Sequence, residues 1–188
     1  INSTRSTDFI TPKSALSKDI RNAVLTLAGE HAFARALVNS GRLSVPTHLS
    51  DSALNTPDAE PFTGLMAPGA PADDAPVALG GVDGWLLQQL GDRFVLMLFG
   101  DDAPAADLLQ ALARAALPVQ LLQVAMQPGP VPTGGSRVVD TQGLAAQRFD
   151  ARPGTCYLLR PDQHVAARWR RFDAAALHAA LARACGRG

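Results

Sequence analysis

FVLMLFGDDAP, from Phe94 to Pro104, is the stretch that decides the fold. Six consecutive apolar residues predict a strand that is buried on both faces of a sheet. Gly100 ends the strand, two aspartates follow, and Pro104 suits the first turn of a helix, where a missing backbone N–H costs little. In α/β proteins this kind of strand-to-helix junction often carries the binding site, so each group at the junction is weighed for chemistry below.

The chain after this junction alternates strands and helices. A helix is expected over 104–117, a second buried strand over 119–124, a short strand followed by a helix over 136–150, and two strands over 155–160 and 164–170. A closing helix begins at Asp173, which is a good N-cap residue. Strand, helix, strand in so few residues predicts a parallel unit with a right-handed crossover. The sequence therefore predicts an α/β fold with a thioredoxin-like core, ordered β-α-β-α-β-β-α around a mixed central sheet. Its expected core residues are Trp85, Phe94, Val95, Leu96, Leu98, Leu121, Leu122, Leu158 and Leu181.

The chain before the junction divides into two further parts. Residues 1–41 are predicted to form a helical arm, with one helix from Ser14 and a second over 31–40. The first helix carries an apolar stripe of Leu16, Ile20, Val24 and Leu27, and Gly29 is expected to interrupt it. Residues 42–81 read as an extended Pro/Gly-rich connector with isolated apolar anchors at Leu43, Val45, Leu54, Phe62 and Leu65. The thioredoxin-like domain is expected over 82–188, beginning with a short helix in VDGWLLQQLG.

Composition excludes several classes of protein. The 188 residues are 47% hydrophobic, and 17 basic and 17 acidic side chains give a formal net charge of zero. Non-specific nucleic-acid binding rests on clustered positive charge, so no nucleic-acid partner is expected. Two cysteines without a CxxC motif exclude a disulfide scaffold and a zinc site and favour a reducing cytoplasm. No apolar run approaches the ~20 residues that a membrane-spanning helix needs.

The candidate chemical groups mostly have structural interpretations. Redox thioredoxins carry two cysteines where Asp101 and Asp102 stand, and carboxylates cannot exchange disulfides, so these acids are expected to cap the following helix. Cys156 lies in the middle of a strand, and Cys185 in the last turn of the closing helix. The four histidines show no ligand spacing. The sequence thus predicts no catalytic, cofactor-binding or metal-binding residue.

The basic cluster near the C-terminus has an alternating pattern. His164, Ala166, Arg168 and Arg170 are expected on the solvent face of their strand, and Trp169 on the core face. This arrangement favours a solvated sheet edge over a nucleic-acid contact.

Several stretches, taken in order, resemble the C-terminal region of FAD-dependent aromatic-ring hydroxylases of the 3-(3-hydroxyphenyl)propionate hydroxylase type. They are GAPADDAPV (69–77), GWLLQQLGDRFVLMLFG (84–100), the D-x-x-G element of Asp140 to Gly143, the Arg160-Pro161-Asp162 turn, and the strand over 164–169. RNAVLTLAGEHAFARALVNSGRLS and LNTPD are similar to the helical tail that follows the catalytic domains of these enzymes. Where the family often has RPDG, this chain has Gln163.

The resemblance implies a particular role. The parent enzyme would be an FAD-dependent monooxygenase that hydroxylates a phenolic substrate with NAD(P)H and O₂. This chain would be its structural or interaction domain, contacting the FAD and substrate domains of the same polypeptide and supporting a homodimer. The flavin-binding motifs lie outside the chain, so no FAD or substrate residue is expected in it.

Two other interpretations stay open. The chain could be a peroxiredoxin-like thiol protein that uses Cys156, which would require a thiolate near neutral pH. It could also be a free-standing thioredoxin-like adaptor.

Overall fold

The computed structural model describes residues 9, 11–31, 34 and 46–187. The chain forms two compact units, Ile1–Pro46 and Thr47–Gly188. In the first unit, helix α2 spans Ala15–Glu30, with Ser14 as its N-cap. The Ser14 hydroxyl accepts a hydrogen bond from the Ser17 amide at 3.1 Å. The expected start is confirmed, but Gly29 lies within the helix. The predicted helix over 31–40 falls largely outside the described residues.

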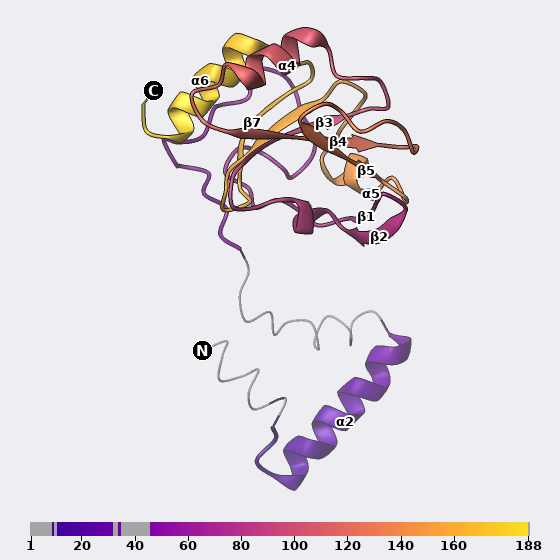
Figure 1. Ribbon diagram of the computed structural model, residues 1–188. Coiled ribbons are helices and arrows are strands. Elements are labelled where there is room, and N and C mark those ends of the chain that lie inside the picture. The colour runs from indigo at the N-terminus through magenta and orange to yellow at the C-terminus, as the bar shows by residue number, and fades with distance from the viewer. Residues whose placement is uncertain (1–8, 10, 32–33, 35–45, 188) are drawn as a thin grey trace. The chain divides into compact units, whose positions relative to one another are not determined.

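The second unit is built on a seven-stranded mixed sheet (Figure 1). Its strands are β1 (Pro76–Leu79), β2 (Val82–Trp85), β3 (Phe94–Phe99), β4 (Val119–Ala125), β5 (Gly135–Val139), β6 (Cys156–Leu159) and β7 (Val165–Trp169), in the spatial order β2-β1-β5-β4-β3-β6-β7. Strands β3, β4 and β5 are parallel, whereas β6 and β7 form an antiparallel hairpin beside β3. The predicted α/β fold with a thioredoxin-like core is confirmed.

The two faces of the sheet bury separate clusters. Helices α4 (Ala106–Ala113) and α6 (Ala174–Ala184) cover one face, where they pack on alternate β3 residues such as Leu96. Helix α5 (Leu144–Arg148) and part of the segment before β1 cover the other face, against Val95 and Met97. Because every β3 residue is buried, the prediction of a strand covered on both faces is confirmed. Eight of the nine expected core residues are buried.

The exception among the expected core residues is Trp85, whose side chain is 50% exposed. The stretch read as one short helix instead forms strand β2 and a 3-10 turn, Leu86–Gln89. The turn at Gly80 and Gly81, both with positive φ, folds β2 back on β1. This hairpin lies beyond the predicted core, and its strand β1 pairs with β5, the short strand expected at the start of 136–150.

From Thr47 on, the connector belongs to the second unit and packs on its sheet. The Thr56 amide donates to the Ala166 carbonyl at 2.8 Å, and the Gly69 amide to the Val165 carbonyl at 2.7 Å. These bonds occupy the outer edge of β7, which would otherwise present unpaired backbone groups. Among the expected anchors, Phe62 packs on the core but Leu65 is 81% exposed; Leu43 and Val45 lie outside the described residues. The division at residues 41 and 81 stays a prediction.

Candidate functional site

The loop after β3 lies at the carboxyl ends of the parallel strands. Gly100 has φ +134°, a backbone conformation that only glycine adopts readily, and its amide donates to the Val124 carbonyl at 3.0 Å. The loop then passes through Asp101 and Asp102 to Pro104 and enters α4. The N-cap of α4 is Ala105, which has no capping side chain. The prediction that Asp101 and Asp102 cap this helix is therefore wrong.

Gln123 holds the loop from below. It is fully buried in β4, and its side-chain amide nitrogen donates to the carbonyls of Gly100 (2.8 Å) and Asp102 (2.7 Å). Its side-chain oxygen accepts a 3.0 Å bond from Arg137. A buried glutamine is tolerated here because each of its polar atoms is satisfied.

Arg137 extends the same cluster from β5. Its guanidinium donates to the carbonyls of Asp101 (3.2 Å) and Gln127 (3.0 Å), and it lies 3.3 Å from the Asp101 carboxylate. The same carboxylate oxygen accepts the amides of Met126 (2.9 Å) and Gln127 (3.0 Å). Asp101 therefore joins the loop after β3 to the loop after β4. The sequence signal for this clamp is a polar residue at a buried strand position, Gln123 in VQLLQV and Arg137 in SRVV.

The cysteines do not form a redox centre. Cys156 is buried in β6, and burial raises the pKa of its thiol to about 12. A thiol with that pKa is protonated at neutral pH and is a poor nucleophile. Cys185 is exposed at the end of α6.

Two of the histidines bind backbone carbonyls. His164 contacts the Thr47 carbonyl at 3.1 Å and His178 the Ala111 carbonyl at 3.1 Å. Within the described part of the chain, no group of three or more His, Cys, Asp or Glu side chains could hold a metal ion. No helix in that part is long and apolar enough to span a membrane.

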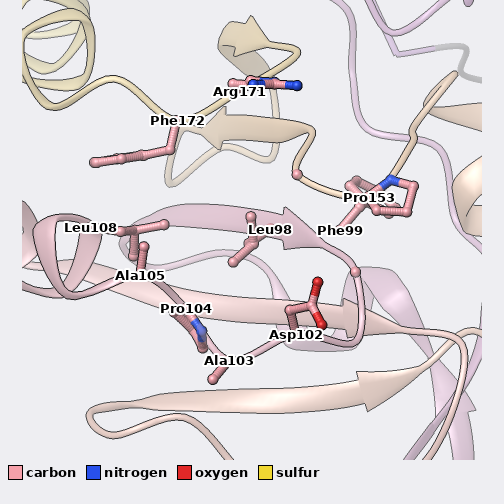
Figure 2. A pocket seen from close by; sticks show the side chains of 12 residues that line it. Leu98, Phe99, Asp102, Ala103, Pro104, Ala105, Leu108, Pro153, Arg171 and Phe172 are labelled. Atoms are coloured by element: carbon pink, nitrogen blue, oxygen red, sulfur yellow. The ribbon is translucent and has the colours of Figure 1, made fainter.

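A hollow of about 340 Å³ lies beside the loop after β3 (Figure 2). The loop forms one wall, Pro153 and Gly154 before β6 form another, and Arg171 and Phe172 after β7 form the third. Buried apolar side chains, including Leu98 and Leu108, form its base. The hollow thus occupies the position where a redox thioredoxin would place its cysteines.

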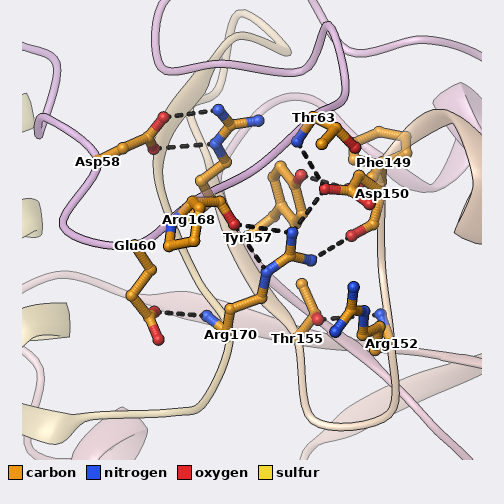
Figure 3. A network of polar contacts seen from close by, with 11 residues as sticks. Asp58, Glu60, Thr63, Phe149, Asp150, Arg152, Thr155, Tyr157, Arg168 and Arg170 are labelled. Atoms are coloured by element: carbon orange, nitrogen blue, oxygen red, sulfur yellow. Dashed lines mark hydrogen bonds and ion pairs between the residues drawn. The ribbon is translucent and has the colours of Figure 1, made fainter.

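A network of polar contacts attaches the connector to β7 (Figure 3). Arg168 is only 6% exposed, and its guanidinium forms two bonds to the Asp58 carboxylate, at 2.9 and 2.6 Å. Its charge also lies 4.3 Å from the centre of the Phe62 ring. The expectation that Arg168 faces solvent is wrong, because the connector covers that face of β7.

Arg170 continues the network at the end of β7. Its amide donates to Glu60 at 2.8 Å, and its guanidinium lies 3.7 Å from the centre of the Phe62 ring. The guanidinium also donates to the Asp150 carboxylate at 2.6 Å. The Thr63 amide, first, and then Arg170 lower the pKa of Asp150. The connector is therefore held by charged hydrogen bonds as well as by packing.

A second hollow, of about 530 Å³, lies on the outer side of this network. Its lining includes Glu60, Asp150 and Arg170 from the network, together with Arg152 and Arg171. Pro153 and Arg171 line both hollows.

The sheet topology and the loop after β3 define a thioredoxin-like domain. Two aspartates stand at the dithiol position, and the buried clamp of Gln123 and Arg137 lies beneath them. The HcaD C-terminal domain family matches residues 81–184, more than half of the chain. The chain belongs to this family. No curated protein matches it in sequence.

Solved structures share the fold. The flavin-dependent monooxygenase PieE, in complex with FAD and substrate, superposes with a TM-score of 0.58 at 20% identity, over 96% of this chain and 32% of that one. Aklavinone-11 hydroxylase in a ternary complex with FAD and aklavinone superposes with a TM-score of 0.55 at 19% identity. The match covers 89% of this chain and 34% of that one. The rebeccamycin biosynthetic enzyme RebC with reduced flavin superposes with a TM-score of 0.52 at 19% identity. The match covers 96% of this chain and 30% of that one. The chain spans about a third of the length of these enzymes. The resemblance to FAD-dependent hydroxylases is thus confirmed in family and fold.

Proposed function

We propose that this chain is the non-catalytic C-terminal domain of an FAD-dependent monooxygenase that hydroxylates a phenolic substrate with NAD(P)H and O₂. One observation carries the proposal: a chain of the HcaD C-terminal domain family shares its fold with flavin monooxygenases about three times its length. FAD and NAD(P)H would bind to the preceding domains of the same polypeptide. The loop after β3 supports this division, because its polar groups hold the loop in place.

The flavin requirement is tested with two proteins. The complete polypeptide, including the part encoded before Ile1, is expected to purify with the absorbance of bound FAD and to oxidise NAD(P)H faster when a phenol is added. The 188-residue chain, titrated with FAD and followed by flavin fluorescence, is expected to show no binding. Stoichiometric FAD binding by the short chain would contradict the proposal. So would an upstream coding sequence without a G-x-G-x-x-G strand–turn–helix motif.

The β1–β2 hairpin is proposed as the surface that contacts the catalytic domains. Leu79, Val82 and Trp85 are 42%, 72% and 50% exposed, and β2 is an edge strand. Apolar side chains gathered on an edge with free backbone groups favour contact with another part of a protein. Val82→Ser in the complete polypeptide is expected to lower the temperature at which FAD is released. The matched control is Val131→Ser, a valine that is 64% exposed in the loop between β4 and β5.

Three further parts of the proposal rest on the sequence. The homodimer is tested by light scattering of the purified chain, and a monomer at high concentration would remove it. A cytoplasmic location and the three-part division at residues 41 and 81 are retained as expectations. Residues 1–68 would wrap either this domain or the catalytic part, and within them Thr56 and Asp58 bond to β7 of this domain.

A thiol enzyme that uses Cys156 is the weaker candidate. Catalysis would need a thiolate near neutral pH, and burial raises the pKa of this thiol to about 12. Thiol titration of the native chain separates the two functions.

A further inference from the structure

The two hollows described above meet at Pro153 and Arg171, which line both of them. The two hollows are therefore adjacent, and the pair is here called the Pro153 groove. It runs from the loop after β3, across the segment before β6, to the connector near Glu60. No feature of the proposed function requires a groove at this place.

In the second hollow the acidic side chains have hydrogen-bond partners, whereas two of the arginines have no ion-pair partner among the described residues. Glu60 accepts the Arg170 amide, and Asp150 accepts the Thr63 amide and the Arg170 guanidinium, so both acids are already engaged. Arg152 and Arg171 are exposed, and among the described residues neither guanidinium has an ion-pair partner. The second hollow therefore offers two cationic groups beside acids that are already bound.

The first hollow is mainly apolar. Phe172 lies across from Leu108 and Ala105 (Figure 2), and Leu98 and Pro104 complete this part of the wall. Asp102 is its one acid, and the carboxylate is exposed. An occupant that fits the whole groove thus needs an apolar group at one end and a negative charge at the other.

We propose that the Pro153 groove binds an extended peptide segment in which an Asp or Glu side chain follows or precedes an apolar side chain. The carboxylate would bind Arg152 and Arg171, and the apolar side chain would contact Phe172 and Leu108. Charge complementarity selects the acid, because charge-assisted pairs between arginine and carboxylate are the strongest hydrogen bonds available here. Asp102 disfavours a second acid at the apolar end and favours a backbone N–H donor.

The shape of the groove selects a peptide over a small molecule. Sites for small molecules are usually concave enough to bury about 70–90% of the ligand. Here Asp102, Ala103, Arg152, Pro153 and Arg171 are exposed along the rim. Two adjacent hollows with an exposed rim instead suit an extended chain that places one side chain in each.

Binding is tested with the 188-residue chain and three fluorescein-labelled peptides. The peptides share the sequence Gly-Ser-Leu-X-Leu-Ser-Gly, with X as Asp, Asn or Lys, and fluorescence anisotropy measures their dissociation constants. The Asp peptide is expected to bind at least about fivefold more tightly than the Asn peptide, since a charge-assisted hydrogen bond between arginine and a carboxylate is stronger than one to a neutral amide. The Lys peptide is expected to bind more weakly than either.

Variants locate the peptide on the protein. Arg171→Ala and Arg152→Ala are each expected to weaken binding of the Asp peptide at least about fivefold and to leave the unfolding temperature unchanged, because both side chains are exposed. The matched control, Arg187→Ala, removes an exposed arginine at the end of α6 and is expected to have no effect. In ¹H–¹⁵N spectra, the amides of Gly154, Thr155 and Phe172 are expected to shift on addition of the Asp peptide.

Four results would overturn the proposal. The first two are that the Asp peptide does not bind at millimolar concentration, and that the Asp and Lys peptides bind with equal affinity. The third is that the Arg171→Ala variant binds the Asp peptide as tightly as the wild type does. The fourth is that acetate at the concentration of the Asp peptide displaces it. The last result would mean that the arginines bind any small carboxylate. Each result leaves the flavin test of the complete polypeptide unaffected, so failure of this proposal is separable from failure of the proposed function.

Discussion

Removing the Asp58 carboxylate should loosen the connector from the sheet. Asp58→Asn keeps the size of the side chain but leaves the Arg168 guanidinium, whose side chain is 3% exposed, without its charged partner. Two charge-assisted bonds, at 2.9 and 2.6 Å, are weakened. The loss of a partner from a fully buried ion pair costs about 3–5 kcal/mol. Asp58 is 30% exposed, and solvent screens part of that cost, so we expect a loss of about 1.5–3 kcal/mol.

The chain contains a matched control pair. Arg93 and Asp92 form the same two-bonded geometry, at 2.6 and 2.7 Å, but their side chains are 53% and 70% exposed. Exposed ion pairs contribute little to stability because solvent screens the two charges. Arg93→Ala is therefore expected to leave the urea midpoint of unfolding unchanged, and the difference between the two pairs isolates the effect of burial.

A double-mutant cycle measures the interaction itself. Asp58→Asn, Arg168→Met and the double variant are unfolded in urea, and fluorescence of the buried Trp169 on the same strand follows the transition. We expect a coupling energy of about 1.5–2.5 kcal/mol, by the reasoning on partly buried pairs. Hydrogen exchange of the Thr56 amide, which bonds to the Ala166 carbonyl, reports local release of the connector. A coupling energy below about 0.5 kcal/mol, the range of a surface pair, would refute the reasoning.

Three further predictions concern thiols, acid and the connector turn. At pH 8 a disulfide reagent should modify only Cys185 in the native chain and should modify Cys156 only in urea. The reason is that burial raises the pKa of the Cys156 thiol to about 12. Rapid modification of both thiols in the native chain would contradict this prediction. The pKa of Asp150 is lower in the folded chain than in the unfolded chain, where it is about 3.9. Its ionised carboxylate therefore stabilises the fold fully at pH values above about 3.9, and this contribution is lost as the pH falls through the folded-state pKa. The stability difference between wild type and Asp150→Asn should therefore shrink below about pH 4, and a constant difference would show that charge is not involved. Gly69→Ala should cost about 3 kcal/mol, because φ is +92° and the new Cβ would lie 2.5 Å from the Leu49 carbonyl oxygen. Gly80→Ala, with φ +59° and open space, should cost about 1 kcal/mol, and equal losses in urea unfolding would rule out the steric argument.

The sequence predicts the central sheet well because its strands carry strong local signals. Six consecutive apolar residues in β3 can be satisfied only by cover on both faces, and the structure supplies two helices on one side and α5 on the other. The start of α6 at Asp173 follows from one side chain, which accepts the Ala176 amide at 2.7 Å. The departure at Gln163 is also accommodated: it adopts φ +64° and donates to the carbonyls of Leu87 and Leu90.

The failures come from contacts between residues that are distant in sequence. Alternation along β7 places Arg168 on the opposite face from Trp169, and that face looks solvent-exposed until the connector, 110 residues away, is laid over it. The sequence predicts Trp85 on the inner side of a short helix with Leu86 and Leu90, but the hairpin turn at Gly80 and Gly81 places it on an edge strand. Neither result can be obtained from local patterns, because each depends on which segment covers which face.

The two aspartates in the loop after β3 have different surroundings. Asp101 accepts two amides and lies beside the Arg137 guanidinium, so its charge is compensated and its lone pairs are engaged. The Asp101 carboxylate therefore serves to hold the loop after β3 against the loop after β4. Asp102 differs: only its carbonyl is bound by Gln123, and its carboxylate is exposed beside the hollow. The clamp therefore fixes the backbone of the loop and leaves a single acid at the apolar end of the Pro153 groove. That arrangement suits selection of a bound segment by charge, for which one fixed acid opposite two arginines is sufficient.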